Sequence, residues 1–213
     1  MVKNMITLSF WGHRFLYDEN IAEKVCNTFS YIFQQDSEFT VYTDDFGDFY
    51  KVCKDVLTKS IQKEYADKSF SLFRVVADNT FALRQKDEPV ICPISFETIQ
   101  YHIQWQRMKK WIIEKSDYIV CYIYKEIEPM DYKDIDYAIR LGKNVFNLTS
   151  EETRKCFIRK IDILPERDKY IITQRNLGIP RSAIGKKLGI SGSRVGQIEA
   201  KARHRLIRLQ IHE

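Results

Sequence analysis

The chain has 213 residues, of which 44% are hydrophobic and 30% charged, with 8 Gly and 5 Pro. This composition excludes collagen-like, linker-like and disordered chains, and a chain of this length can bury a core without disulfides or a structural metal. Residues 1–150 carry 19 Lys and Arg against 22 Asp and Glu, a net charge of −3, whereas residues 151–213 carry 15 against 7, a net charge of +8. A short basic segment behind an acidic body predicts a charged partner for that segment.

Residues 1–150 alternate between strand-like and helix-like patterns. Apolar runs predict about five strands, at 6–11, 39–43, 69–77, 118–124 and 144–148. Apolar residues at helical spacing predict helices between them, at 19–34, 52–65, 99–112 and 135–141. Alternation of this kind implies a parallel sheet with helices on both faces. We therefore expect an α/β, Rossmann-like domain over residues 1–150.

Strand patterns end after Ser150, and only helical patterns follow. We expect a connecting helix at 151–163 and three shorter helices at about 166–176, 181–188 and 193–210. Between the last two, Gly189 is suited to the positive φ that ends one helix, and Ser191 is suited to capping the next. Two helices joined by such a turn form a helix-turn-helix, so residues 151–213 are expected to be an all-α domain.

The helix-turn-helix segment has a distinctive sequence. Residues 183–206 read AIGKKLGISGSRVGQIEAKARHRL, and residues 164–167 read LPER. These segments resemble the fourth region of primary sigma factors, in which a helix of the type E-I-G-x-x-L-G-V-S leads into R-V-R-Q-I-E-A-K-A-L and an L-P-x-R-E-R segment precedes both. The resemblance implies a promoter-reading fold, with double-stranded DNA as a partner and RNA polymerase as a second one.

The two helices have an apolar side and a basic side. The apolar seam expected to hold them together consists of Ile184, Leu188, Val195, Ile198, Ala202 and Leu206. On the basic side, guanidinium and ammonium groups can neutralise phosphates while the helix lies in a major groove, and Gln197 can pair with an adenine edge. We assign DNA binding to these residues: Lys186, Lys187, Ser191, Ser193, Arg194, Gln197, Lys201, Arg203 and Arg205.

Three positions depart from the sigma pattern. Gly192 and Ser193 stand where sigma factors usually carry the base-reading pair Arg-Glu, and Gly196 stands where they usually carry an arginine that faces phosphate. The promoter sequence of the family therefore does not carry over, and the remaining cations are expected to position the helix rather than to specify bases. A helix-turn-helix used for protein docking is the alternative interpretation.

Four segments of the α/β domain also form a pattern: FWGHR at 10–14, FGDF at 46–49, WIIEKSDYIV at 111–120 and YAIRLGKNVFNL at 137–148. In this order they resemble a YpsA-type member of the SLOG superfamily, and the resemblance covers about residues 1–148. It implies a Rossmann-like fold that binds nucleotides or nucleotide-derived signals. The glycine-rich phosphoribohydrolase signature P-G-G-x-G-T-x-x-E is missing from the chain, which argues against catalysis.

Ligands of open parallel sheets bind beyond the carboxyl ends of the strands. The loop residues assigned to such a ligand are Gly12, His13, Arg14, Asp44, Asp45 and Gly47. Ordinary turn and helix-capping roles are the competing interpretation of the aspartates, which include Asp48. The alternative of a nucleotide-processing enzyme would use Arg14 to hold phosphate and an aspartate of 44–48 as acid or base. No catalytic residue, metal ligand or cofactor beyond a nucleotide-derived ligand is assigned.

The favoured hypothesis is a DNA-binding transcription regulator. Its SLOG-like domain would sense a nucleotide-derived ligand or mediate self-association, and we expect a homodimer because one small reading head binds weakly alone. The alternatives are the nucleotide-processing enzyme and an adaptor for RNA polymerase. The five cysteines form no C-x-x-C pair, no apolar run reaches bilayer length, and the N-terminus lacks a signal-peptide core. These features predict a cytoplasmic protein without a membrane partner.

Overall fold

The structure is a computed structural model that describes residues 5–13, 16, 18–36, 38–44, 47–77, 89–93, 101–125, 129–151, 161–177 and 179–208. It divides into two compact units. The first, called the α/β unit below, comprises residues 1–14, 20–122 and 134–148. The second, called the helical unit, comprises residues 15–19, 123–133 and 149–213. The helical unit thus takes in two short segments from the first part of the sequence besides its carboxyl-terminal part.

Strands and helices alternate through the first part of the chain, as the sequence predicts. The strands are β1 (Ile6–Gly12), β2 (Glu38–Thr43), β3 (Ser69–Val75), β4 (Val90–Ile91), β5 (Tyr118–Tyr122) and β6 (Asn144–Asn147). The longer helices between them are α1 (Ile21–Phe33), α2 (Gly47–Val56), α5 (Tyr101–Lys115) and α6 (Pro129–Arg140). Helix α2 continues through a π-helical turn, η1 (Leu57–Ile61), into the short α3 (Gln62–Glu64).

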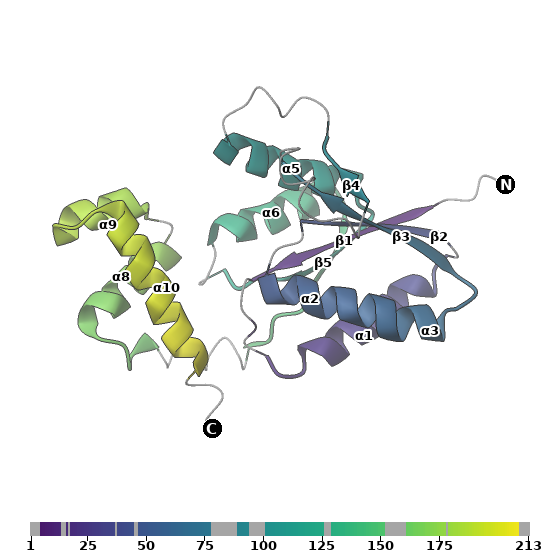
Figure 1. Cartoon of the computed structure of the whole chain (residues 1–213), viewed down its shortest axis with the longest axis horizontal. Helices are drawn as coiled ribbons and strands as arrows, with labels where there is room; N and C mark the ends of the chain where they lie inside the picture. The colour runs from purple at the N-terminus through teal and green to yellow at the C-terminus, as the bar shows by residue number, and fades with distance from the viewer. Residues whose placement is uncertain are drawn as a thin grey trace. The chain divides into compact units, whose positions relative to one another are not determined.

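The described strands form a parallel six-stranded sheet in the order β4-β3-β2-β1-β5-β6. Helices α1 and α2 cover one face, and α5 and α6 cover the other (Figure 1). The α/β, Rossmann-like prediction is therefore confirmed. The strand order reverses between β1 and β5, which register with Leu8 opposite Tyr118 and Gly12 opposite Tyr122. Such a reversal is where ligands of doubly wound sheets usually bind.

The sheet has one strand more than the five expected. Val90 and Ile91 pair with Arg74 and Val75 of β3, in a segment that the sequence analysis treats as a polar connection. Two residues are too few to show a strand period, and the prolines at 89 and 93 suggest a loop. An edge strand tolerates nearby prolines because one side of it makes no ladder hydrogen bonds, which explains the missed prediction.

Aromatic side chains make much of the core of the α/β unit. Phe10 of β1 is fully buried, and its ring lies 6.0 Å from that of Phe29 in α1 and 6.1 Å from that of Tyr50 in α2. The Phe33 ring stacks on Phe39 of β2 at 4.1 Å. Aromatic side chains of α1 and α2 thus pack on those of β1 and β2 at one face of the sheet.

Three helices make the described core of the helical unit: α8 (Glu166–Asn176), α9 (Arg181–Leu188) and α10 (Gly192–Arg208). Their bounds agree with the predicted helices to within a residue wherever residues are described. Residues 152–160 of the expected connecting helix and 209–210 of the expected last helix lie outside the described residues. Members of the predicted seam are buried: Ile184, Val195, Ile198, Ala202 and Leu206, with Leu188 partly buried. Ile171 of α8 joins them.

The turn between α9 and α10 follows the sequence prediction. Gly189 has φ +66°, and its N–H donates to the Gly185 carbonyl, so it ends α9 in the left-handed conformation. The Ser191 side chain accepts a hydrogen bond from the Arg194 N–H at 3.1 Å, which caps α10. Gly185 is required as well, since a Cβ there would lie 2.5 Å from the Ile190 carbonyl oxygen. These contacts close a tight helix-turn-helix.

Across the part of the chain that the structure describes, every helix is too short or too polar to cross a membrane.

Candidate nucleic-acid interface

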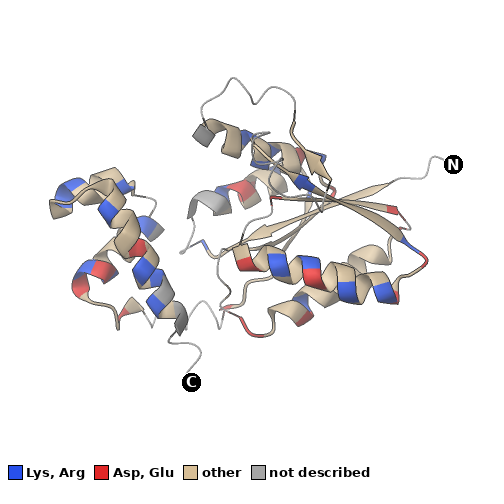
Figure 2. Cartoon of the chain, viewed as in Figure 1, with Lys and Arg blue, Asp and Glu red and all other residues tan. Residues whose placement is uncertain are grey.

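Helix α10 places polar and basic side chains opposite its buried seam. The seam residues recur about every third or fourth position, which leaves the other side of the helix to solvent. On α10, the exposed residues that the sequence analysis assigns to DNA are Ser193, Arg194, Gln197, Lys201 and Arg205. Within its bounds, α10 has five Lys and Arg residues and one acidic residue, Glu199, and Figure 2 shows this excess of basic positions along the helix.

Two exposed residues of α10 hold each other in place. Arg194 Nη1 donates a hydrogen bond to Gln197 Oε1 at 2.9 Å. The Gln197 carboxamide therefore has its oxygen engaged and its NH₂ group available as a donor. The Ser191 side chain is held at the start of α10 by the hydrogen bond that it accepts from the Arg194 N–H. The arrangement suits polar contacts in a groove.

Helix α9 carries two of the lysines assigned to DNA. Lys186 and Lys187 are both exposed in the last turn of α9. The Lys187 ammonium lies 5.2 Å from the centre of the Tyr170 ring in α8, a cation–π distance. Lys187 is thereby directed toward α8, whereas Lys186 shows no such contact among the described residues. Both cations also suit the negative end of the α9 dipole.

Arg203 departs from the predicted position on the exposed face. Its side chain is 11% exposed, and its guanidinium donates to Glu199 Oε1 from Nε at 3.4 Å and from Nη2 at 3.1 Å. The two residues are one helical turn apart, so the arginine reaches back to a buried carboxylate. The structure thus gives Arg203 a partner within the unit that helical periodicity alone does not show.

Glu199 binds arginines from all three helices. Besides Arg203 of α10, its Oε2 accepts hydrogen bonds from Arg181 Nε of α9 at 2.9 Å and from Arg175 Nε of α8 at 3.3 Å. Burial acts to raise the pKa of Glu199, but Arg203, Arg181 and Arg175 outweigh it and hold that pKa below its ordinary value. Arg175 also donates to the Ile179 carbonyl at 2.8 Å. Glu199 and its three arginines form an ion-pair cluster, called the hub below, that joins α10 to α8 and α9.

In the α/β unit, the predicted ligand residues have different environments. Gly12 ends β1, and a Cβ there would lie 2.6 Å from Phe49 Cδ1, so the ring of Phe49 fills the space that the missing side chain leaves. His13 is 1% exposed, and its ring meets that of Tyr122 edge to face at 5.8 Å. Gly47 has φ +87° at the start of α2. Arg14 and Asp45 lie outside the described residues.

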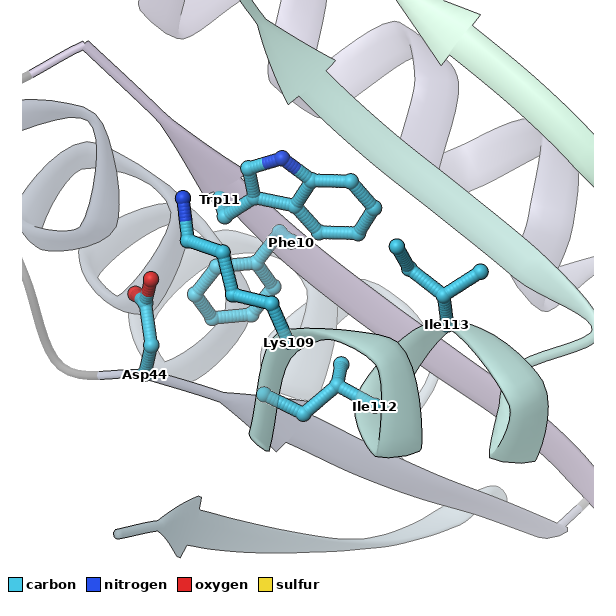
Figure 3. Close-up of a pocket in the computed structure, with 6 residues that line it drawn as sticks. All are labelled: Phe10, Trp11, Asp44, Lys109, Ile112 and Ile113. Atoms are coloured by element: carbon cyan, nitrogen blue, oxygen red, sulfur yellow. The ribbon is translucent and has the colours of Figure 1, made fainter. Parts of the chain in front are cut away.

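Asp44 belongs to a small pocket at the carboxyl end of the sheet. The pocket is lined by Phe10, Trp11, Asp44, Lys109, Ile112 and Ile113. Figure 3 shows the Lys109 side chain rising from α5 between Asp44 and the indole of Trp11. Trp11 is 5% exposed, and its indole N–H has no acceptor among the described residues. The lining of this pocket is mostly apolar, and Asp44 and Lys109 are its charged residues.

Lys109 also connects this pocket to α6. Its ammonium lies 4.0 Å from Asp134 Oδ2, and the lysine side chain is 13% exposed. Burial raises the pKa of Asp134, and the charges of Lys109 and Lys110 offset only part of that rise. The sequence analysis misses Lys109 and Trp11; the available signal was a lysine between the buried Met108 and Ile112 on α5.

Asp48 lies at the start of a helix, as the competing interpretation of the aspartates expects. It lies in the first turn of α2 and accepts a hydrogen bond from Lys51 Nζ at 2.8 Å. The described ranges bring together no group of three His, Cys, Asp or Glu side chains that could hold a metal ion. The described cysteines, Cys26, Cys53, Cys92 and Cys121, are free thiols.

Comparison with known proteins bears on the helical unit. Residues 161–207 match the family model of sigma-70, region 4, a span that takes in α8, α9 and nearly all of α10. None of the curated proteins compared with the chain matches it. The carboxyl-terminal helices are therefore a helix-turn-helix like that of sigma region 4, and the match supports a DNA-binding role related to transcription.

Proposed function

We propose that this protein is a transcription regulator that binds double-stranded DNA through the exposed face of α10. The observation that carries the proposal is the combination of a sigma region 4-like frame with an exposed face of basic and polar side chains on its last helix. An α-helix fits the major groove of B-DNA, and a helix-turn-helix inserts its second helix there. Helix α10 is the second helix of this motif.

The side chains of this face have separable roles in the proposal. Arg194, Lys201 and Arg205 neutralise phosphates and release counterions, which sets affinity and orientation. Gln197, whose carboxamide oxygen is held by Arg194, directs its NH₂ group toward a base-edge acceptor. Ser193 is small and polar and allows close approach. One side chain of this face reads bases, so the sequence specificity is modest. The phosphate contacts contribute most of the affinity.

A salt titration tests this proposal. The dissociation constant of wild-type protein for duplex DNA is measured by fluorescence anisotropy between 50 and 300 mM salt. We expect affinity to fall steeply with salt, and the Lys201→Ala variant to reduce the slope of log affinity against log salt by about one unit. Lys59→Ala is the matched control, since Lys59 is an exposed lysine of the α/β unit with a side chain 72% exposed. Binding by wild-type protein that does not change with salt would contradict the proposal.

For the α/β unit we propose a sensing role, in which a nucleotide-derived ligand binds at the carboxyl end of the sheet. The pocket beside Asp44 supports it, because it lies near the ends of β1 and β2, next to the reversal of strand order between β1 and β5 where ligands of such sheets usually bind. The space on the Phe49 side of Gly12 is already filled by that ring, so the ligand would lie on the Lys109 side of β1. Self-association of this unit is the other part of the proposal.

Thermal unfolding with added nucleotides tests the sensing role. A panel of nucleoside mono-, di- and triphosphates is added at 1 mM, and the unfolding midpoint is recorded for wild-type, Lys109→Ala and Lys115→Ala proteins. A ligand that binds the native state raises the midpoint. We expect at least one nucleotide to stabilise wild-type and Lys115→Ala proteins but not Lys109→Ala; Lys115 is an exposed lysine of the same helix. No midpoint shift across the panel would remove the sensing role and leave DNA binding standing.

RNA polymerase is a second proposed partner, because the matched family is a region of sigma factors. Co-purification with polymerase after nuclease treatment is the expected result. Loss of the polymerase together with the DNA would show that the two are linked only through DNA.

A further inference from the structure

Arg181 is the first residue of α9, and its side chain lies across α10. A Cβ built on Gly196 would be 3.4 Å from the Cζ, Nε and Nη1 atoms of Arg181, which is ordinary van der Waals contact. The guanidinium therefore covers the α10 backbone where residue 196 has no side chain. With a side chain that is 54% exposed, Arg181 still faces solvent at this place.

The Glu199 carboxylate fixes the Arg181 side chain through one nitrogen. Arg181 Nε donates to Glu199 Oε2 at 2.9 Å, and the terminal Nη1 and Nη2 groups have no hydrogen-bond partner among the described residues. A guanidinium held by its Nε is preorganised, because little rotamer freedom remains to be lost when its outer edge binds a ligand.

The charge balance of the hub leaves positive charge at Arg181. Among these four side chains, one carboxylate faces three guanidinium groups. The other two arginines are 23% and 11% exposed, and Arg175 has a further bond to the Ile179 carbonyl. Arg181 is thus the member of the hub that can offer its charge to an external anion.

Arg181 lies at the edge of the exposed face of α10 that is opposite to the edge with Arg194, Lys201 and Arg205. Successive residues of an α-helix are about 100° apart, so Arg194, Lys201 and Arg205 fall on one side of Gln197 and position 196 on the other. A helix in a major groove has a sugar-phosphate backbone on each side. The three cations of α10 therefore serve one strand, and the opposite strand needs a cation at position 196, where α10 has only glycine.

We propose that Arg181 supplies this cation: it binds a DNA phosphate on the strand opposite to the one that Arg194, Lys201 and Arg205 contact, and Glu199 positions it by holding Nε. This inference rests on the proposed DNA binding and adds to it a binding residue from α9. Arg181 was assigned to no function by the sequence analysis, because the first turn of a helix gives no periodic signal for such a role.

Arg181→Gln and Arg175→Gln form a matched pair for the test. Both variants remove one positive charge from a side chain that donates to the same Glu199 oxygen, and glutamine can still donate a hydrogen bond there. The salt dependence of duplex DNA binding is measured for wild-type and both variants below their unfolding temperatures, which circular dichroism establishes. We expect Arg181→Gln to reduce the salt slope by about one unit, Arg181→Lys to restore it and Arg175→Gln to leave it unchanged.

Three other outcomes of this experiment would overturn the inference. A wild-type slope in Arg181→Gln overturns the inference, since Arg181 would then have only a structural role. An equal loss of slope in Arg175→Gln and Arg181→Gln also overturns it, because the effect would come from the charge of the hub rather than from a contact. If wild-type protein itself shows no salt-dependent binding, the proposed function fails, and this inference fails with it.

Discussion

Glu199 and Arg203 lie one turn apart on α10, and the Arg203 guanidinium makes two hydrogen bonds to Glu199 Oε1, from Nη2 at 3.1 Å and from Nε at 3.4 Å. The carboxylate is buried, and arginines from α8 and α9 reach its other oxygen. The hub thus joins three helices that also pack through apolar side chains around Val195. Its arginines hold the pKa of Glu199 below the ordinary value, which favours the ionised carboxylate.

Replacing the carboxylate is expected to destabilise the helical unit. Glu199→Gln keeps the volume but removes the negative charge that the mostly buried Arg175 and Arg203 face. Breaking a buried ion pair costs about 3–5 kcal/mol, and we expect about 3 kcal/mol because Arg181 can turn to solvent. Urea unfolding followed by circular dichroism measures this loss. Glu166→Gln, at an exposed acid of α8, is the control and should cost less than about 1 kcal/mol.

Acid should destabilise the same unit. The pKa of Glu199 is lower in the folded state than its ordinary value of 4.5. A carboxyl with a depressed pKa contributes stability above its ordinary pKa, and this contribution is lost as pH falls through the folded value. We expect the unfolding midpoint of the wild-type unit to drop below about pH 4.5 and the Glu199→Gln variant to show a flatter profile there. Parallel profiles for the two proteins would contradict this role of Glu199.

The packing of the turn between α9 and α10 predicts which of two glycine substitutions is more destabilising. At Gly185 a Cβ would meet the backbone oxygen of Ile190, which cannot move without opening the turn. At Gly189 no atom lies within 4 Å, and the penalty comes only from φ +66°. That conformation costs an alanine about 1–2 kcal/mol. We expect Gly185→Ala to lower the unfolding midpoint and the DNA affinity more than Gly189→Ala does. The reverse order would show that the turn is not packed as described.

A substitution at Gly12 tests the close packing at the end of β1. The Cβ of Gly12→Ala would lie 2.6 Å from the ring of Phe49, which is fully buried against Tyr122. Overpacking of this kind costs about 1–3 kcal/mol. We expect the smaller side chain of Phe49→Leu to relieve part of the cost in the double variant, a coupling that thermal unfolding of the four proteins measures. Purely additive losses would argue against direct contact between the two positions.

The sequence predicts local features better than those made by distant residues. Gly189 and Ser191 are read correctly because a turn depends on adjacent residues, and the seam of α10 follows from its periodicity. The hub around Glu199 is not predictable in this way, because Arg175 and Arg181 come from other helices and are 24 and 18 residues away. Arg203 is misplaced by helical periodicity for the same reason, since its position depends on the buried carboxylate.

In the α/β unit, too, features made by adjacent residues are predicted better than those made by distant residues. Its strand and helix alternation is enough to predict the parallel sheet, whereas β4 is too short to leave a pattern. Gly12 is assigned to a ligand from the sequence, and in the structure the Phe49 ring fills the space that its missing side chain leaves. Lys109 and Trp11 come from elements about 100 residues apart, and only the folded sheet brings them to one pocket.

Site-specific photocrosslinking tests the central claim most directly. A photoreactive phenylalanine analogue is placed at Gln197 of α10 in one protein and at Lys59 of the α/β unit in another, both exposed positions, and each protein is irradiated with labelled duplex DNA. We predict a covalent protein–DNA product from position 197 that disappears with excess unlabelled duplex, and none from position 59. Equal products from the two positions, or a product from position 59 alone, would contradict the assignment of DNA binding to the exposed face of α10.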